Sequence, residues 1–168
     1  MTTLFFPVYT NEASAEDLRA IDKSPFTEQQ LAEFDEESRA SFCQQQAYLE
    51  AHPPIGICRW ATTGSQTRDG GVIRQATLPL KVILACGQDV YFAQVGDCVV
   101  YSDGSTAQIM TGAGRGNSSV ALVGSLLSNG DQIINTPQEA VLCVLRDGVP
   151  MPEDFLPTLP SIEGMSHA

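Results

Sequence analysis

The feature that most constrains the fold lies in residues 55–149, where short β-branched and aromatic runs are separated by turn residues about every ten positions. Val90-Tyr91-Phe92-Ala93-Gln94-Val95 ends at Gly96-Asp97, and Cys98-Val99-Val100-Tyr101 ends at Ser102-Asp103-Gly104-Ser105. Crossover helices between parallel strands need a dozen or more residues, and no such stretch separates these runs. The sequence therefore predicts an all-β unit of short strands.

A weak internal repeat runs through this region. Gly96-Asp97-Cys98-Val99-Val100 is matched to Gly130-Asp131-Gln132-Ile133-Ile134, with Asp69-Gly70-Gly71-Val72-Ile73 as a looser copy, and Ala93-Gln94-Val95-Gly96 is similar to Ala121-Leu122-Val123-Gly124. Glycine adopts positive φ readily, and an aspartate side chain can cap its own turn. We interpret six residues as structural turn residues: Gly96, Asp97, Gly104, Gly124, Gly130 and Asp131.

Residues 1–54 form an acidic segment that we predict to be helical. Ser14 and Asp17 have the spacing of a capping box, and Pro25 suits the first position of a second helix. No Gly or Pro interrupts residues 27–51, so one continuous helix is expected there, ended by Pro53-Pro54.

An apolar stripe on the predicted helix 27–51 supplies the candidate partner-binding residues, Leu31, Phe34, Phe42 and Leu49. The stripe has two interpretations that the sequence leaves open. It packs against the chain's own β unit, or it holds a partner protein.

Charge limits the classes of partner. Nine Lys and Arg residues against twenty Asp and Glu residues give a formal net charge of −11. Such a chain repels phosphate backbones and anionic lipid, so nucleic acid and membrane surfaces are not expected partners. Its apolar runs are far shorter than a membrane span, and no signal peptide is visible, so folding in the cytoplasm is expected. Residues 150–168 contain four prolines and predict an extended tail.

No enzyme chemistry stands out. The five cysteines form no Cys-x-x-Cys pair and are expected to be free and mostly buried thiols, which leaves a hydrolase using Cys58 or Cys98 as a minor alternative. Gly112-Ala113-Gly114-Arg115-Gly116-Asn117 lacks the third glycine of a dinucleotide fingerprint. His52 is expected to cap a helix, and a calcium site from the turn aspartates is less favoured than turn duty. The sequence thus predicts no catalytic residue and no cofactor.

Three stretches, taken in order, resemble one family. Arg59-Trp60-Ala61 through Asp69-Gly70-Gly71, then Ala93 through Gly104, then Ala121-Leu122-Val123-Gly124-Ser125 with Asn129 through Ile134, are similar to the PAAR family over roughly residues 55–137. The resemblance implies a small β cone that caps the trimeric β-helical spike of a type VI secretion apparatus. Many proteins of this family carry flanking segments that act as toxins or adaptors, and the flanks here, 54 and 19 residues long, favour recruitment of cargo over a toxin domain.

The family's tip is usually held by zinc through histidines and a cysteine. Here Asp69, Tyr101 and Asp103 occupy the positions where the resemblance places those ligands, and no histidine lies between His52 and His167. We therefore expect no metal at this tip, with packing or side-chain contacts in its place.

The resulting division is an acidic helical segment at 1–54, a PAAR-like β domain at 55–149 and a Pro-rich tail at 150–168. The leading hypothesis is a non-enzymatic spike-tip protein, one copy per spike trimer, made in the cytoplasm and delivered outside the cell, with flanking segments that recruit an effector or adaptor. The alternative is an acidic immunity- or chaperone-like protein that binds a basic partner.

Overall fold

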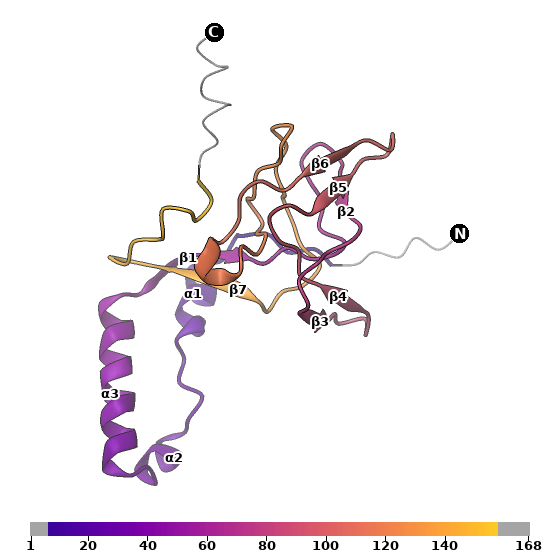
Figure 1. The fold of residues 1–168 in the computed structure, drawn as a ribbon. Helices are drawn as coiled ribbons and strands as arrows, with labels where there is room; N and C mark the ends of the chain where they lie inside the picture. The colour runs from indigo at the N-terminus through magenta and orange to yellow at the C-terminus, as the bar shows by residue number, and fades with distance from the viewer. Residues whose placement is uncertain (1–6, 158–168) are drawn as a thin grey trace. The chain divides into compact units, whose positions relative to one another are not determined.

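The structure is a computed structural model that describes residues 7–157. Its helices are α1 (Ala15–Ile21), α2 (Glu28–Ala32), α3 (Glu36–Ala51) and the 3₁₀ helix η1 (Arg115–Asn117). Its strands are β1 (Pro54–Arg59), β2 (Val72–Ile73), β3 (Lys81–Ile83), β4 (Asp89–Tyr91), β5 (Cys98–Val100), β6 (Thr106–Gln108) and β7 (Leu142–Arg146) (Figure 1). They form three small sheets, β1-β7, β2-β5-β6 and β3-β4, so the predicted mainly β character is confirmed.

The chain divides into two compact units. The β unit contains residues 7–11, 58–143 and 151–157, and the helical unit contains residues 12–57 and 144–150. The division falls inside β1 and β7, three residues beyond the boundary expected at 54. The structure also places residues 144–150 with the helices, a connection that the sequence did not indicate.

Side-chain caps begin each helix of the helical unit. The predicted capping box of α1 is confirmed, since Ser14 Oγ accepts from the Asp17 N–H at 3.0 Å and the Asp17 carboxylate accepts from the Ser14 N–H. The predicted start at Pro25 is wrong, because Thr27 is the cap of α2. Its hydroxyl accepts from the N–H of Gln30, whose side chain closes a second capping box.

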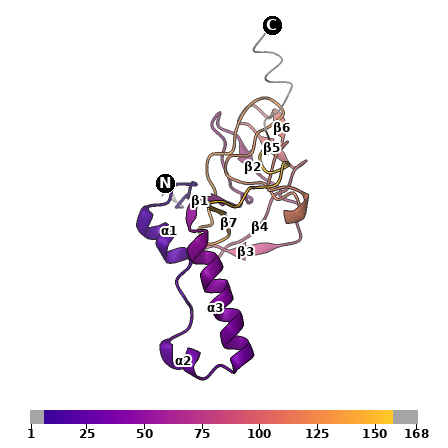
Figure 2. The same cartoon turned by 90° about the vertical axis from the view of Figure 1, so that its left-hand side faces the viewer.

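The predicted continuous helix over residues 27–51 is also wrong, because the chain turns between Ala32 and Glu36. Asp35 causes the break: its carboxylate accepts the Ser38 N–H at 2.7 Å and so begins α3, a role that aspartate fills better than an interior helix position. The turn lets the α2 segment run back beside α3, as Figures 1 and 2 show. The helix ends at Ala51 with His52 as its C-cap, as expected.

The centre of the β unit is a closed ring of three backbone hydrogen bonds. The Ala61 N–H donates to the Ala121 carbonyl at 2.8 Å, Ala121 donates to Ala93 at 2.8 Å, and Ala93 donates to Ala61 at 3.0 Å. All three alanines are completely buried. Three segments far apart in sequence therefore meet around one axis, each paired with the other two.

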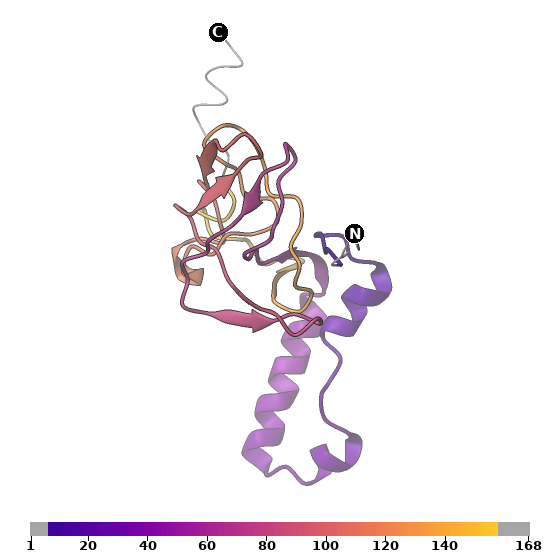
Figure 3. The same ribbon diagram turned by 90° about the vertical axis from the view of Figure 1, so that its right-hand side faces the viewer.

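The same three-fold pattern continues outward from the ring. After each alanine, the same three segments pair a second time. The backbone pairs are Thr67 with Ile133, Val99 with Ile73, and Leu127 with Ile109. These six side chains are between 0% and 3% exposed and, except for Thr67, belong to one apolar core. The β unit thus contains three repeats, residues 61–73, 93–109 and 121–133. Figure 3 draws the short strands of the first two, β2, β5 and β6, whereas the third is joined through isolated bridges.

Each repeat has two turns with glycine at the same place. The first turn contains Gly64, Gly96 or Gly124, with φ of 94°, 99° and 108°, and the second contains Gly70, Gly104 or Gly130, with φ of 91°, 86° and 88°. Only glycine adopts these values without strain. After the first glycine, the side chains of Ser65, Asp97 and Ser125 each accept the backbone N–H three residues earlier.

This geometry corrects the alignment of the repeat. Sequence comparison pairs Gly96-Asp97 with Gly130-Asp131, but the structural equivalent of Gly96-Asp97 is Gly124-Ser125. In both pairs the side chain of the second residue accepts the backbone N–H three residues earlier. Gly130 lies instead at the second turn, with Gly104. The matching of Ala93 through Gly96 to Ala121 through Gly124 agrees with the structure.

The tail predicted from residue 150 is not simply extended. The Leu156 N–H donates to the Gly112 carbonyl at 2.8 Å, and the Asp154 carboxylate accepts the Arg115 N–H at 2.8 Å. Residues 154–156 therefore pack on the loop at residues 112–115, because the Gly112 carbonyl and the Arg115 N–H pair with them there. The rest of the predicted tail, 158–168, lies outside the described residues.

A substitution at Gly71 tests the packing of the second turns. An added Cβ would clash with Cγ1 of Val99 and lie 2.9 Å from both Oγ1 of Thr67 and Cε1 of Tyr101. Gly71→Ala is therefore expected to lower the free energy of unfolding by about 1–3 kcal/mol in a urea titration. Gly116→Ala, where a Cβ meets nothing within 4 Å, is the control and should change stability far less. Equal stability of the two variants would contradict the packing described here.

Candidate functional site

The second turns of the three repeats come together around an open hollow of about 250 Å³. Repeat 61–73 contributes Asp69, repeat 93–109 contributes Tyr101, Asp103 and two serines, and repeat 121–133 contributes Asn129. The structure thus brings together the three residues that stand at the expected ligand positions, Asp69, Tyr101 and Asp103. We call this end of the β unit the turn end.

Tyr101 and Asp131 form the closest contact at the turn end. The Tyr101 hydroxyl donates to Oδ2 of Asp131 at 2.5 Å and accepts from Nδ2 of Asn129 at 3.0 Å. Burial and the hydrogen bond to Asp131 raise the pKa of Tyr101, since both disfavour the phenolate. The hydroxyl is therefore a proton donor at neutral pH.

Asp131 is completely buried and accepts several donors. Its Oδ1 accepts the backbone N–H of Asp69 at 3.1 Å and that of Gln132 at 2.7 Å. Burial alone would raise the pKa of Asp131, but the hydrogen bonds from Thr67, Tyr101 and these backbone groups outweigh it and hold the pKa below its ordinary value. Asp131 is thus a stabilised buried carboxylate.

The other two acids face their own neighbours. Oδ1 of Asp103 accepts the N–H and the hydroxyl of Ser105 at 2.9 and 2.6 Å, and these bonds lower the pKa of Asp103. Asp69 lies 3.6 Å from Nε of Arg68 in an exposed ion pair.

These residues do not fit the zinc that the family resemblance implies. Structural zinc takes thiolate and imidazole ligands in a closed tetrahedron, whereas the turn end offers a protonated phenol, an amide and carboxylates. The buried carboxylate, Asp131, already receives four hydrogen-bond donors. Across residues 7–157 no three His, Cys, Asp or Glu side chains lie close enough to hold a metal ion.

The helical unit carries the candidate partner-binding residues. Phe34 and Phe42 contact each other and Phe26, with ring centroids 5.0 to 6.5 Å apart and edge-on geometry. Leu31, Phe34, Phe42 and Leu49 are all half-buried, and Phe26 is 41% exposed. The predicted stripe is therefore partly used inside the unit, because the break at Asp35 folds α2 back toward α3.

Sequence reasoning missed two members of this surface. Phe26 directly precedes the cap Thr27, and Leu31 is the fourth residue of α2, which is the spacing of a hydrophobic staple and could have indicated Phe26. Arg146 makes a two-point ion pair with Asp22, at 2.7 and 2.8 Å, which lowers the pKa of Asp22. No sequence signal joins residues so distant. A hollow of about 360 Å³ in the helical unit is lined by Asp22, Phe26 and Arg146 together with Phe42 and Leu49.

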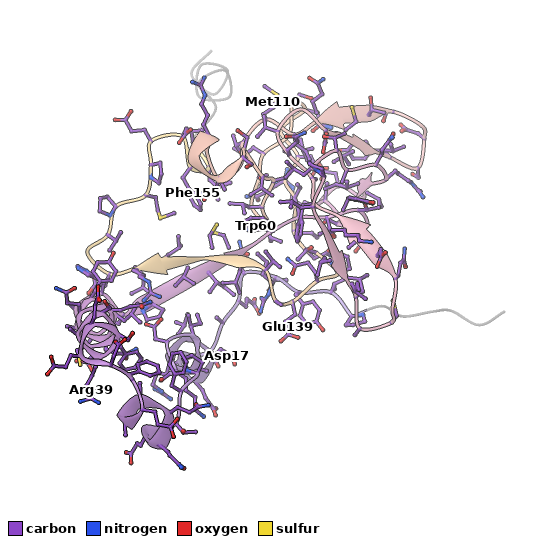
Figure 4. The ribbon with its side chains drawn as sticks, turned by 60° about the horizontal axis from the view of Figure 1, so that its bottom comes forward. Asp17, Arg39, Trp60, Met110, Glu139 and Phe155 are labelled. Atoms are coloured by element: carbon purple, nitrogen blue, oxygen red, sulfur yellow. The ribbon has the colours of Figure 1, made fainter. Side chains whose placement is uncertain are left out.

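A second apolar hollow, of about 180 Å³, lies in the β unit. It is lined by residues 82–86 at the β3-β4 hairpin, by Pro7 and Tyr9, and by residues 137–140. Figure 4 labels Glu139 at this segment, together with Trp60, Met110 and Phe155 from other parts of the β unit and Asp17 and Arg39 from the helical unit. This hollow includes the exposed Cys86 and none of the predicted site residues.

The cysteines and the glycine-rich loop have ordinary surroundings. All five thiols are free, but the expectation that most are buried is wrong, since Cys43, Cys86 and Cys98 lie at the surface. Burial raises the pKa of Cys58 to about 11, which disfavours the nucleophilic thiolate. In the loop at Gly112–Asn117 the chain's own Asp154 carboxylate accepts the Arg115 N–H.

Comparison with known proteins finds no matching family model, no matching curated protein and no matching solved structure. Among residues 7–157, no helix combines the length and apolar character needed to cross a membrane.

The aromatic cluster of the helical unit supports a further prediction. Phe42→Ala removes the ring that contacts both Phe26 and Phe34, and half-burial of a phenylalanine contributes about 1–2 kcal/mol. We expect the helical far-UV circular dichroism signal to melt at lower temperature. Ala47→Ser, an exposed change on the same helix, is the control, and identical melting of the two variants would contradict a stabilising cluster.

Proposed function

We propose that this chain is a non-enzymatic spike-tip protein that caps the trimeric β-helical spike of a type VI secretion system. The observation that carries the proposal is the ring of hydrogen bonds among Ala61, Ala93 and Ala121, around which one chain repeats its backbone pairing three times. A single chain that caps a three-fold object must offer three similar sides, and this ring supplies them. The resemblance of the same three stretches to the PAAR family supports it independently.

The helical unit is proposed to recruit an effector or adaptor. Residues 12–57 hold ten acidic and three basic side chains, and a half-exposed aromatic cluster lies beside them. Apolar side chains left partly exposed next to charge are typical of a binding surface. On this proposal the protein is made in the cytoplasm and leaves the cell on the spike.

The same acidic surface favours a second candidate, an immunity- or chaperone-like protein that binds a basic partner. Charge-based association of this kind weakens as salt screens it, whereas docking through apolar strand edges tolerates salt. The two candidates therefore differ in the salt dependence of the complex.

Native mass spectrometry of the chain mixed with the trimeric β-helical spike protein encoded nearby tests the proposal. We expect the mass of one spike trimer plus one chain, because the chain itself supplies all three sides. The complex should persist after incubation in 1 M salt, which reduces the Debye length to about 3 Å.

The Phe42→Ala variant is the control for this experiment, since it weakens only the helical unit and should still give the one-to-three complex. Absence of any complex between the folded components would contradict the spike-tip function. Three chains per trimer, or loss of the complex in salt, would also count against it and would favour the acidic binding protein.

A further inference from the structure

We infer that a polar network of Thr67, Tyr101, Asn129 and Asp131 holds the turn end of the β unit together without any metal ion. The inference concerns the β unit itself, so it goes beyond the proposed spike-tip function and does not depend on it. Its basis is that the buried Asp131 receives donors from all three repeats.

The network crosses every boundary between the repeats. From repeat 61–73, the Thr67 side chain and the Asp69 N–H donate to Asp131; from repeat 93–109, Tyr101 does so at 2.5 Å. Asn129, from the same repeat as Asp131, donates to the Tyr101 hydroxyl at 3.0 Å. Removal of Asp131 would therefore leave donors of two other repeats without their acceptor.

The three equivalent positions after the second turn show how the network is accommodated. Gly71 and Asp131 are equivalent, since each accepts a hydrogen bond from the residue four positions earlier, Thr67 or Leu127. At Gly71 a side chain would collide with Thr67 and Tyr101, whereas at Asp131 the carboxylate binds them. Repeat 93–109 is four residues longer, and there the same hydrogen bond runs from the Tyr101 N–H to the Ser105 carbonyl, so Ser105 is the third equivalent position. Glycine, serine and aspartate thus occupy the three equivalent positions, and only Asp131 supplies a carboxylate there.

The protonation states of Asp131 and Tyr101 set the pH range over which the network stabilises the folded chain. The charged groups around it are Asp69, Asp103 and Arg68, of which Asp69 pairs with Arg68 and Asp103 with Ser105. Because the folded pKa of Asp131 is lowered, its stabilisation is present above the unfolded pKa of about 4 and is lost as pH falls through the folded value. Because the pKa of Tyr101 is raised, its stabilisation is complete below about pH 10 and is lost at higher pH.

The test measures thermal unfolding of the full chain with and without a chelator. We expect EDTA and added zinc chloride each to leave the Tm within about 1 °C of its starting value. Tyr101→Phe deletes one hydroxyl and should lower the Tm by about 3–8 °C, as expected when a buried acceptor loses its donor. Tyr91→Phe, at an exposed tyrosine whose hydroxyl has no hydrogen bond to residues 7–157, is the matched control and should melt like the wild type.

A second readout follows the tyrosines directly. In an absorbance titration, the wild type should show a phenol whose pKa lies above the ordinary value of tyrosine, and Tyr101→Phe should lack it. The free energy of unfolding should differ less between pH 3 and pH 7 in Asp131→Asn than in the wild type, because the variant lacks the carboxylate that is protonated at low pH. A chelator that lowers the Tm, about one zinc per purified chain, or a Tyr101→Phe variant that melts and titrates like Tyr91→Phe would each overturn the inference.

Discussion

The ring of hydrogen bonds among three buried alanines is the constraint on which the β unit depends. Each alanine uses its N–H toward one neighbour and its carbonyl toward the other, so none of the three segments pairs with only one partner. Alanine suits this place because its side chain lets three backbones approach closely. Isolated pairs of strands this short are marginally stable in water, and closure of the ring gives every segment two neighbours.

The sequence allowed the β character and the turn glycines to be predicted but not the register of the repeat. Gly96-Asp97 and Gly130-Asp131 are identical in sequence but not equivalent in structure, because glycine followed by a polar residue occurs in two different turns. Hydrogen bonds equate Asp97 with Ser125 instead, two residues that share only the ability to accept a backbone N–H. Because the repeat at 93–109 has four extra residues, equivalent residues of the three repeats are not separated by a constant number of positions, and a search for a fixed period does not detect them.

The helical unit shows a similar limit. The absence of Gly and Pro over residues 27–51 predicts a helix, but it does not reveal that Asp35 begins a new one. A cap competes with the helix interior through a single hydrogen bond, and the outcome depends on the packing of Phe34 against Phe26 and Phe42. At the turn end, the lack of histidine could be read from the sequence, whereas the role of Asp131 depends on contacts between distant repeats.

The departures from three-fold symmetry bear directly on the proposed function. Outside the ring, Phe92 pairs with Leu80 at the β3-β4 hairpin, and Trp60 pairs with Val141 beside β7. The third side has no such hairpin, and Leu156 pairs with Gly112 there instead. A trimer of identical chains could not present three different edges around one axis, but one chain can. On the proposed function, the central bonds would match three equivalent spike subunits, while the outer segments would give each trimer a single acidic helical unit.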